Sequence, residues 1–126
     1  MTQHPTPDET RGFAARLHEM RAAADAEHRA LRESLKVVLE LRGDGSADDE
    51  HDPDGSTLSG EWSRVYGLEK ESAASRAAID RAIARIEEGG YGLCLRCGNP
   101  IGVPRLEARP AAEHCIDCAR AEQERR

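Results

Sequence analysis

Residues 91–100 read YGLCLRCGNP, and residues 115–118 read CIDC. These two stretches hold all four cysteines of the chain, as two Cys-x-x-Cys pairs separated by residues 98–114. Two thiolates spaced by two residues can bind one metal ion from a tight turn, and a second such pair completes a tetrahedron. The spacing therefore predicts one zinc site whose ligands are Cys94, Cys97, Cys115 and Cys118.

Two Cys-x-x-Cys pairs also occur as two disulfides, as a redox-active dithiol pair or around an iron–sulfur cluster. Disulfides are rare in cytoplasmic chains, and this two-pair spacing favours zinc over an iron–sulfur cluster. Gly98 and Asn99 tolerate the positive φ that a metal-binding turn needs. His114 is an alternative ligand beside Cys115, although four cysteines already complete a site. Because four thiolates leave no open position, we expect a structural zinc.

The composition argues against a conventional single-core enzyme. Of 126 residues, 38% are hydrophobic and 33% are charged, and only four are aromatic: Phe13, Trp62, Tyr66 and Tyr91. The sequence has neither a phosphate-binding glycine loop nor a nucleophile elbow. No apolar run approaches the roughly 18 residues of a membrane span, and the N-terminus lacks a signal-peptide pattern. We expect a cytoplasmic protein that is not an enzyme.

A first long helix is predicted over residues 8–42. Thr6, Pro7 and Glu9 form the signature of a helix start, with a cap, a proline at the first position and a capping box. Residues 1–7 are polar with two prolines, and we expect a disordered lead. Apolar residues then recur at steps of three and four, as in a coiled-coil seam, with Glu27 or His28 bridging one gap. They are Phe13, Leu17, Met20, Ala24, Leu31, Leu35 and Val38.

A second helix is predicted to begin near Ser59 or Glu61 and to stop at Gly89 or Gly90, where glycine can adopt the left-handed cap. Its seam follows the same steps at Trp62, Val65, Leu68, Ser72, Ser75, Ile79, Ile83 and Ile86. Two long helices joined by a polar loop fold back most simply as an antiparallel hairpin, while pairing with a second copy is the alternative.

We therefore predict a mainly α fold. A long antiparallel helical hairpin (coiled coil) occupies residues 8–88, and a small four-cysteine zinc module with a short C-terminal helix occupies residues 89–126. The loop at residues 43–61 carries seven acidic groups and no basic one, whereas the net charge of the whole chain is −6. It is either a solvated acidic loop or a segment that meets a cation or a basic surface. Nowhere is there the excess of Lys and Arg that DNA-backbone binding requires.

The residues around the cysteines resemble the DksA/TraR family of four-cysteine zinc-finger transcription regulators. The resemblance rests on residues 91–101 (YGLCLRCGNPI), 105–110 (RLEARP) and 115–118 (CIDC), with residues 83–87 (IARIE) leading into them. It is specific over about residues 79–120. Over the rest of the hairpin it is a resemblance of architecture.

This resemblance implies a partner and a mode of binding. Members of the family bind bacterial RNA polymerase, with the coiled coil in the secondary channel and an acidic tip close to the catalytic magnesium. Their zinc module and C-terminal helix rest against the polymerase exterior, and several members act together with guanosine tetraphosphate. They are not enzymes and need no direct DNA contact. For this chain we expect RNA polymerase as partner, no membrane, and a monomer.

The tip departs from the family pattern of two aspartates three residues apart with an alanine two residues later. An ungapped alignment from the zinc region puts Asp54 at the second aspartate, His51 at the first and Ser56 at the alanine. Asp49 and Asp52 have the right separation, but Asp54 then replaces the alanine. The resemblance makes Asp49, Asp52 and Asp54 the candidates for modulating the polymerase active site.

The effector site departs further. In responsive members a basic residue follows the last cysteine and another lies on the second helix, where this chain has Ala119 and Ala78. Arg109 matches the basic set and is the candidate effector contact, so we expect a weak response to guanosine tetraphosphate or none. Two other classes of function stay open: a zinc-ribbon adaptor or scaffold that binds another protein through its helices, and a thiol redox sensor that loses zinc on oxidation.

Overall fold

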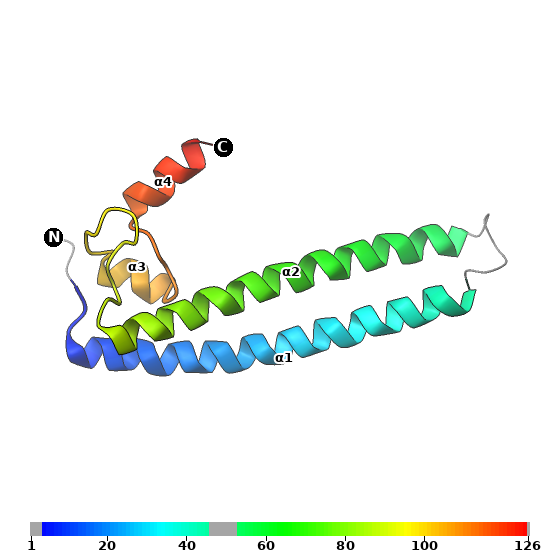
Figure 1. Ribbon diagram of the computed structural model, residues 1–126, viewed down its shortest axis with the longest axis horizontal. Coiled ribbons are helices and arrows are strands. Elements are labelled where there is room, and N and C mark those ends of the chain that lie inside the picture. The colour runs from blue at the N-terminus through cyan, green and yellow to red at the C-terminus, as the bar shows by residue number, and fades with distance from the viewer. Residues whose placement is uncertain (1–3, 46–52, 126) are drawn as a thin grey trace. The chain divides into compact units, whose positions relative to one another are not determined.

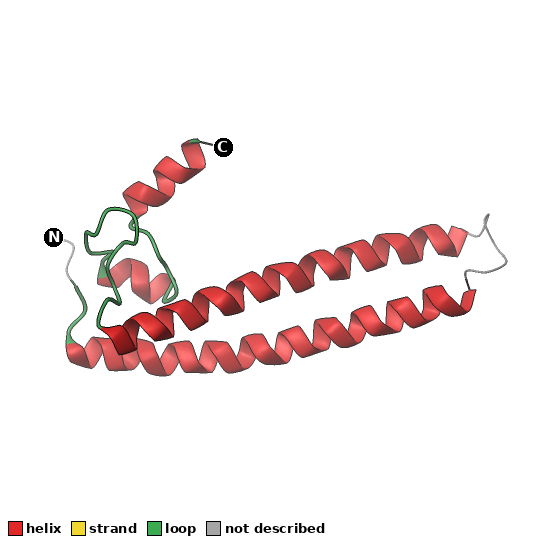
Figure 2. Ribbon diagram, in the orientation of Figure 1, coloured by secondary structure: helices red, strands yellow, loops and turns green. Residues whose placement is uncertain are grey.

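The computed structural model describes residues 4–45 and 53–125, with side chains over 4–41 and 59–125 (Figure 1). The described chain forms α1 (Pro7–Gly45), α2 (Pro53–Glu88), α3 (Val103–Ala108) and α4 (Ile116–Glu124). Loops join the last three helices (Figure 2), and an isolated antiparallel bridge links Leu93 to Pro100. The predicted mainly α fold, with a long helix pair ahead of a four-cysteine region and a short C-terminal helix, is confirmed.

The chain divides into two compact units. Unit 1 consists of Met1–Ala22 and Ala77–Arg126, and unit 2 consists of Ala23–Arg76. Each unit contains a stretch of α1 and a stretch of α2. The first turns of α1 belong to the unit that holds the cysteines, because they pack with the residues around them. The rings of Phe13 and Tyr91, with centroids 5.8 Å apart, form one such contact.

The start of α1 is the predicted capping box. The Thr6 hydroxyl oxygen accepts a hydrogen bond from the Glu9 backbone N–H at 3.1 Å, and the Glu9 carboxylate accepts one from the Thr6 N–H at 3.0 Å. Residues 4–6 were expected in a disordered lead, yet Pro5 is buried. A Cβ atom on Gly92 would lie 2.8 Å from Cδ of Pro5. The loop after α2 thus holds this segment, and Gly92 leaves the room for it.

The predicted seam of α1 is confirmed. Phe13, Leu17 and Val38 are buried, and the positions between them that were expected to face α2 are half-buried. The gap in the apolar repeat is bridged by His28, which is half-buried, and not by Glu27, which is exposed. The imidazole is accommodated because its Nε2 atom lies 3.8 Å from a carboxylate oxygen of Glu69 on α2.

The predicted seam of α2 is partly wrong. Val65, Ser72 and Ile79 are buried as expected, but Ser75 and Leu68 are exposed. The neighbouring positions Glu69 and Arg76 are half-buried in their place. They turn inward because each has a charged or polar partner on α1, with Nε of Arg76 donating to Asp25 at 3.0 Å. Such cross-helix pairing stabilises the helix pair more than the burial of one serine would.

The two helices are longer at the loop than predicted. α1 ends at Gly45 and not near residue 42, and α2 begins at Pro53 and not at residues 59–61. Proline suits this place because its φ is already helical and the first turn needs no N–H from it. The expected acidic loop at 43–61 is shortened accordingly. Asp49, His51 and Asp52 lie outside the described residues, and Asp54 is in the first turn of α2 with its side chain outside them.

The C-terminal end of α2 is a glycine cap, as predicted. Gly89 has a φ of 91°, the N–H of Gly90 donates to the carbonyl of Arg85 at 2.9 Å, and the N–H of Gly89 donates to Ile86 at 3.3 Å. This Schellman motif turns the chain sharply away from the helix axis. Among the described residues, no helix has the length and apolarity needed to cross a membrane.

Candidate metal centre

The four cysteine sulfurs meet at one place in unit 1. All four Sγ atoms lie within 4.8 Å of one another, and those of Cys97 and Cys115, from different pairs, are 3.8 Å apart. Four Zn–S bonds of about 2.3 Å in a tetrahedron separate the sulfurs by about 3.8 Å. Both the donor set and the spacing therefore fit a zinc ion, and the more distant sulfurs need to approach by only about 1 Å.

The first pair sits on a tight turn between residues 93 and 100. The N–H of Cys94 donates to the carbonyl of Asn99 at 2.8 Å, and the N–H of Gly98 donates to the carbonyl of Cys94 at 2.9 Å. Gly98 has a φ of 77°, which confirms the expected left-handed residue, whereas Asn99 does not adopt a positive φ. The turn brings Cys97 back beside Cys94.

The second pair lies at the start of α4. Cys115 is the N-cap residue and Cys118 follows in the first turn. The N–H of Leu95 donates to the carbonyl of Glu113 at 2.8 Å and joins the two halves of the site. His114, the alternative ligand, is exposed and stays out of the sulfur cluster; its carbonyl accepts a 2.9 Å hydrogen bond from Nε of Arg105.

The sulfurs differ in their readiness to ionise. Burial raises the pKa of the Cys94 thiol, but the backbone groups of Cys97, Cys115 and Arg96 donate to its sulfur and lower the pKa to about 6. The pKa of Cys118 is raised to about 12, first by desolvation and then by hydrogen bonds with the other sulfurs. Four thiolates in so small a space repel one another, and a divalent cation is what allows all of them to be charged at neutral pH.

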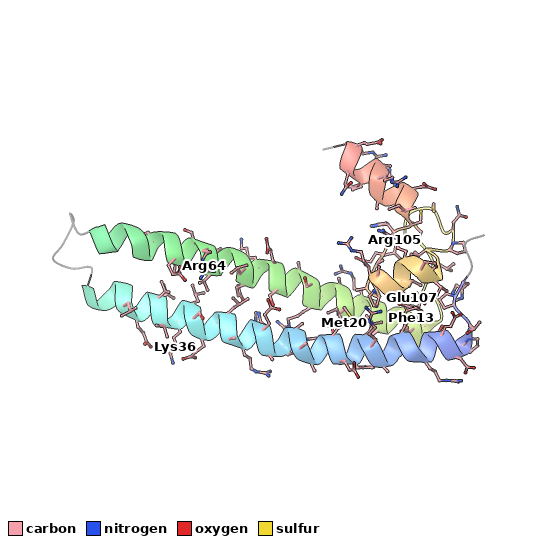
Figure 3. All side chains as sticks on the ribbon, turned by 180° about the vertical axis from the view of Figure 1, so that it is seen from behind. Phe13, Met20, Lys36, Arg64, Arg105 and Glu107 are labelled. Atoms are coloured by element: carbon pink, nitrogen blue, oxygen red, sulfur yellow. The ribbon has the colours of Figure 1, made fainter. Side chains whose placement is uncertain are left out.

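A small core supports the cysteines from one side. Tyr91, Ile101 and Leu106 are almost fully buried, together with Phe13 and Leu17 from α1. Nη1 of Arg16 on α1 donates to the carbonyl of Glu107 in α3 at 2.5 Å, and Figure 3 labels Phe13 and Glu107 in this region. Within unit 1, the segment between the two cysteine pairs thus contacts α1 through this hydrogen bond and through the small core.

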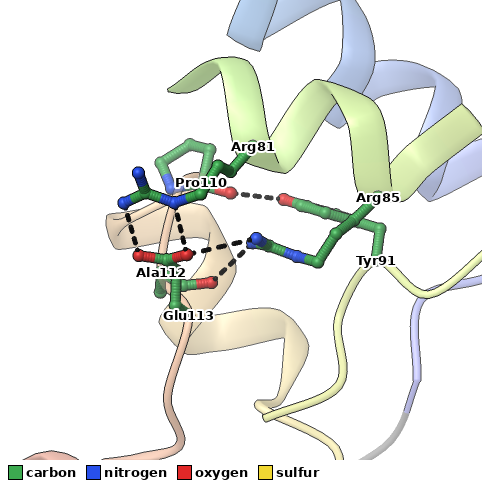
Figure 4. Close-up of polar contacts among 6 residues, drawn as sticks. All are labelled: Arg81, Arg85, Tyr91, Pro110, Ala112 and Glu113. Carbon is green, nitrogen blue, oxygen red and sulfur yellow. Dashed lines mark hydrogen bonds and ion pairs between the residues drawn. The ribbon is translucent and has the colours of Figure 1, made fainter. Parts of the chain in front are cut away.

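An ion-pair cluster ties α2 to the loop before the second cysteine pair (Figure 4). Arg81 makes two hydrogen bonds of 2.9 Å to the carboxylate of Glu113, and the buried Arg85 reaches the same carboxylate with its guanidinium at 3.4 Å. Hydrogen bonding from Arg81 lowers the pKa of Glu113 despite partial burial. Sequence reasoning missed these residues: Arg81 and Arg85 are one helical turn apart, but nothing near them in the sequence points to Glu113.

The candidate effector contact, Arg109, is not part of the sulfur cluster. Arg109 is the C-cap residue of α3 and is exposed, and its backbone N–H donates to the carbonyl of Arg105 at 2.8 Å. The acidic tip candidates Asp49 and Asp52 lie outside the described residues. Of the site residues predicted from the sequence, the structure therefore brings together the four cysteines.

Comparison with known proteins agrees with this site. Residues 89–124 match the family described as prokaryotic dksA/traR C4-type zinc finger. The RNA polymerase-binding transcription factor DksA of Caulobacter vibrioides is 36% identical over 98 residues, which cover 76% of this chain and 66% of that protein. The protein of the same name from Escherichia coli K12 is 48% identical over 40 residues, which cover 32% of this chain and 26% of that protein. The matches thus span about two thirds of these relatives or less.

Two solved structures share the fold. The transcription factor DksA2 from Pseudomonas aeruginosa matches with a TM-score of 0.77 and 23% identity, over 94% of this chain and 86% of that one. A Dks protein from Chlamydia trachomatis matches with a TM-score of 0.52 and 22% identity, over 96% and 94%. The four clustered cysteines and the zinc-finger match make this centre one structural zinc site.

Proposed function

The chain belongs to the DksA/TraR family, and we propose that it is a non-enzymatic transcription regulator that binds bacterial RNA polymerase in the cytoplasm. The observation that carries the proposal is the 36% identity over 98 residues to an RNA polymerase-binding factor. An alignment that covers 76% of the chain reaches well beyond the zinc finger at residues 89–124 and into the helices. If the two proteins shared only the zinc fold, the sequences of their helices would be expected to be unrelated.

The hairpin is the element that we assign to the polymerase, inserted in the secondary channel as the family resemblance implies. In support, unit 2 exposes five large apolar or aromatic side chains. They are Val37, Leu39, Leu41, Tyr66 and Leu68, between 37% and 53% exposed. Exposed apolar side chains gathered in one segment are typical of a surface that a partner protein covers.

The tip and the effector response are the finer parts of the proposal. Asp49, Asp52 and Asp54 act near the polymerase active site, although His51 and Ser56 stand at two positions of the family motif. Guanosine tetraphosphate has little or no effect, since Ala119 and Ala78 replace two basic residues and Arg109 alone remains. A transcription assay in which that nucleotide changes the protein's effect by tenfold would contradict this part. The protein acts as a monomer and without sequence-specific DNA contact.

The experiment that tests the function is binding of the zinc-loaded protein to purified bacterial RNA polymerase, with a known secondary-channel factor as competitor. We expect binding at micromolar affinity or better, and loss of binding when the competitor is added. Binding that the competitor leaves unchanged would move the contact away from the channel. Absence of binding would overturn the proposal.

The alternative is an adaptor that binds a different protein through its helices. The altered tip motif is the observation that favours it, because a protein without a channel function has no need of that motif. An adaptor would neither bind the polymerase nor compete with channel factors, so the same experiment separates the two functions.

A further inference from the structure

Unit 2 has two sides of opposite charge, and two cross-helix contacts define them. Asp25 accepts a hydrogen bond from Arg76 at 3.0 Å, and Nε2 of His28 lies 3.8 Å from a carboxylate oxygen of Glu69. As the residue number rises on α1 it falls on α2, so the two stretches run antiparallel. Each further residue turns by about 100° around its helix. Any position in unit 2 can therefore be assigned to the side that carries these contacts or to the opposite one.

On α1, the side with these contacts is basic. Arg29, Arg32 and Lys36 follow Asp25 at steps of four, three and four residues, so they continue its stripe. Together with Leu39 they line a surface groove of about 730 Å³, whose other lining residues are Glu33, Leu35 and Glu40. The groove combines three cations with two leucines and two carboxylates.

On α2, the same side is aromatic. Trp62 and Tyr66 precede Glu69 by seven and three residues and so face the way it does. Their rings stack with centroids 5.0 Å apart and an angle of 7° between the planes. The ammonium group of Lys70 lies 4.8 Å from the centre of the Tyr66 ring. We call the surface formed by Arg32, Lys36, Leu39, Trp62, Tyr66 and Lys70 the basic side.

The opposite side is acidic. Glu27 comes two residues after Asp25, and Glu71 comes two residues after Glu69. Two residues turn by about 200° around a helix, so both glutamates point away from the side that carries the contacts. Arg64 also faces this way, but its guanidinium is engaged by the carboxylate of Glu61 at 2.5 Å. Among the described side chains of unit 2, the acidic side therefore carries no group of cations like that of the basic side.

We infer that the basic side is the surface through which the hairpin binds the polymerase, and that it docks on an acidic, partly apolar protein surface. The inference rests on the proposed function and adds to it the side of the hairpin and the chemistry of its target. Carboxylates of the partner pair with Arg32, Lys36 and Lys70, while Leu39 and the Trp62–Tyr66 stack lose their exposed apolar area. Arginine and aromatic residues are the types that dominate protein interfaces, and the charge orients the encounter.

A nucleic acid fits this surface less well than a protein does. Glu33 and Glu40 line the same groove between the cations, so a continuous phosphate backbone would meet them, whereas separate carboxylates on a protein surface can be placed against the cations alone. Trp62 is one turn before Tyr66 and Lys70 one turn after it, so the tyrosine ring is covered from both directions. A base has no free tyrosine face on which to stack.

Lys36 and Arg64 provide a matched test. Both are exposed cations, Lys36 on α1 and Arg64 on α2 (Figure 3). The contacts of Asp25 with Arg76 and of His28 with Glu69 place them near one level of the antiparallel pair, and the helical repeat puts them on opposite sides. The zinc-loaded full chain carrying Lys36→Glu or Arg64→Glu is titrated against purified RNA polymerase at two salt concentrations. We expect Lys36→Glu to weaken binding by about tenfold or more and to reduce its salt dependence, and Arg64→Glu to change it by less than about threefold.

The outcomes separate this inference from the proposed function. If the unmodified protein does not bind the polymerase, the function fails and the inference fails with it. If it binds and the two variants behave alike, the side assignment is overturned while the function stands. If Lys36→Glu binds the polymerase normally but loses affinity for a single-stranded oligonucleotide, the surface serves nucleic acid and the inference is wrong. Far-UV circular dichroism and a second variant, Arg32→Glu, guard against misfolding of one variant.

Discussion

The hydroxyl of Tyr91 donates a 2.8 Å hydrogen bond to the carbonyl oxygen of Pro110, and both residues are buried (Figure 4). Burial raises the pKa of the phenol to about 12, so the hydroxyl stays protonated and remains a donor under all ordinary conditions. This bond links the residue after the α2 cap to the chain that leads to the second cysteine pair. It therefore connects the segments that lead to the two cysteine pairs.

Replacing Tyr91 with Phe should lower the stability of the zinc-loaded protein by about 1–2 kcal/mol, because the buried carbonyl of Pro110 loses its partner. Urea unfolding followed by circular dichroism measures the change. Tyr66→Phe is the matched control: Tyr66 is 38% exposed, and its substitution is expected to stay within about 0.5 kcal/mol. Equal effects of the two variants would mean that the hydrogen bond to Pro110 contributes nothing.

Glu113→Gln should destabilise the protein by about 1 kcal/mol at pH 7, since Arg81 and Arg85 lose a charged partner. The pKa of Glu113 is lowered from 4.5, chiefly by the hydrogen bonds of Arg81. A lowered pKa gives stability that is fully present above pH 4.5 and is lost as the pH falls through the lowered value. The difference in unfolding free energy between the two proteins should therefore be constant from pH 7 to pH 5. Below pH 4.5 the difference should shrink, whereas a difference that grows as the pH falls would mean a raised carboxyl pKa in the folded protein.

Zinc removal, or Cys97→Ser, should unfold residues 90–120 and leave much of α1 and α2 helical. The small core around Tyr91, Ile101 and Leu106 holds too few side chains to keep these loops folded without the metal. Limited proteolysis maps the exposed region, and far-UV circular dichroism follows the helices. Re-addition of zinc to the chelated protein should restore protection. The prediction fails if chelation leaves the proteolysis of residues 90–120 unchanged.

Changing Asp49, Asp52 and Asp54 together to Asn should alter the transcriptional output of the protein while its polymerase affinity stays within a few fold. The reason is that these carboxylates are assigned to the active-site effect and not to docking. In vitro transcription with purified polymerase measures the output. A triple control, Asp44→Asn with Asp48→Asn and Glu50→Gln, removes the same charge from neighbouring acids. Unchanged output in the first variant would sink the tip assignment.

The features that could be predicted from the sequence are those that depend on the spacing of residues close together in the chain. Two residues separate Cys94 from Cys97, and the glycine at position 98 indicates the turn on which they lie. The steps from Phe13 to Leu17 to Met20 reveal the buried face of α1, since a helix repeats every 3.6 residues. Each of these patterns is complete within one or two turns of chain.

Features that depend on distant partners could not be predicted. Arg85 is buried because Glu113, in a separate loop, supplies a counter-charge, and no local pattern announces that pairing. Ser75 fits the apolar repeat as well as Arg76 does, yet Asp25 on the other helix selects Arg76. Pro5 is ordered by the open backbone at Gly92. In each case the deciding contact joins residues far apart in the chain.

The division into two units also bears on the order in which the chain folds during synthesis. Unit 2 is one unbroken stretch, Ala23–Arg76, whereas unit 1 needs Met1–Ala22 together with Ala77–Arg126. On the ribosome the hairpin of unit 2 can close as soon as its own residues have emerged, but the first 22 residues must wait for almost the whole chain. Until the cysteines appear, Phe13 and Leu17 lack the surface that buries them. The nascent protein is thus most exposed to aggregation just before the zinc site is completed.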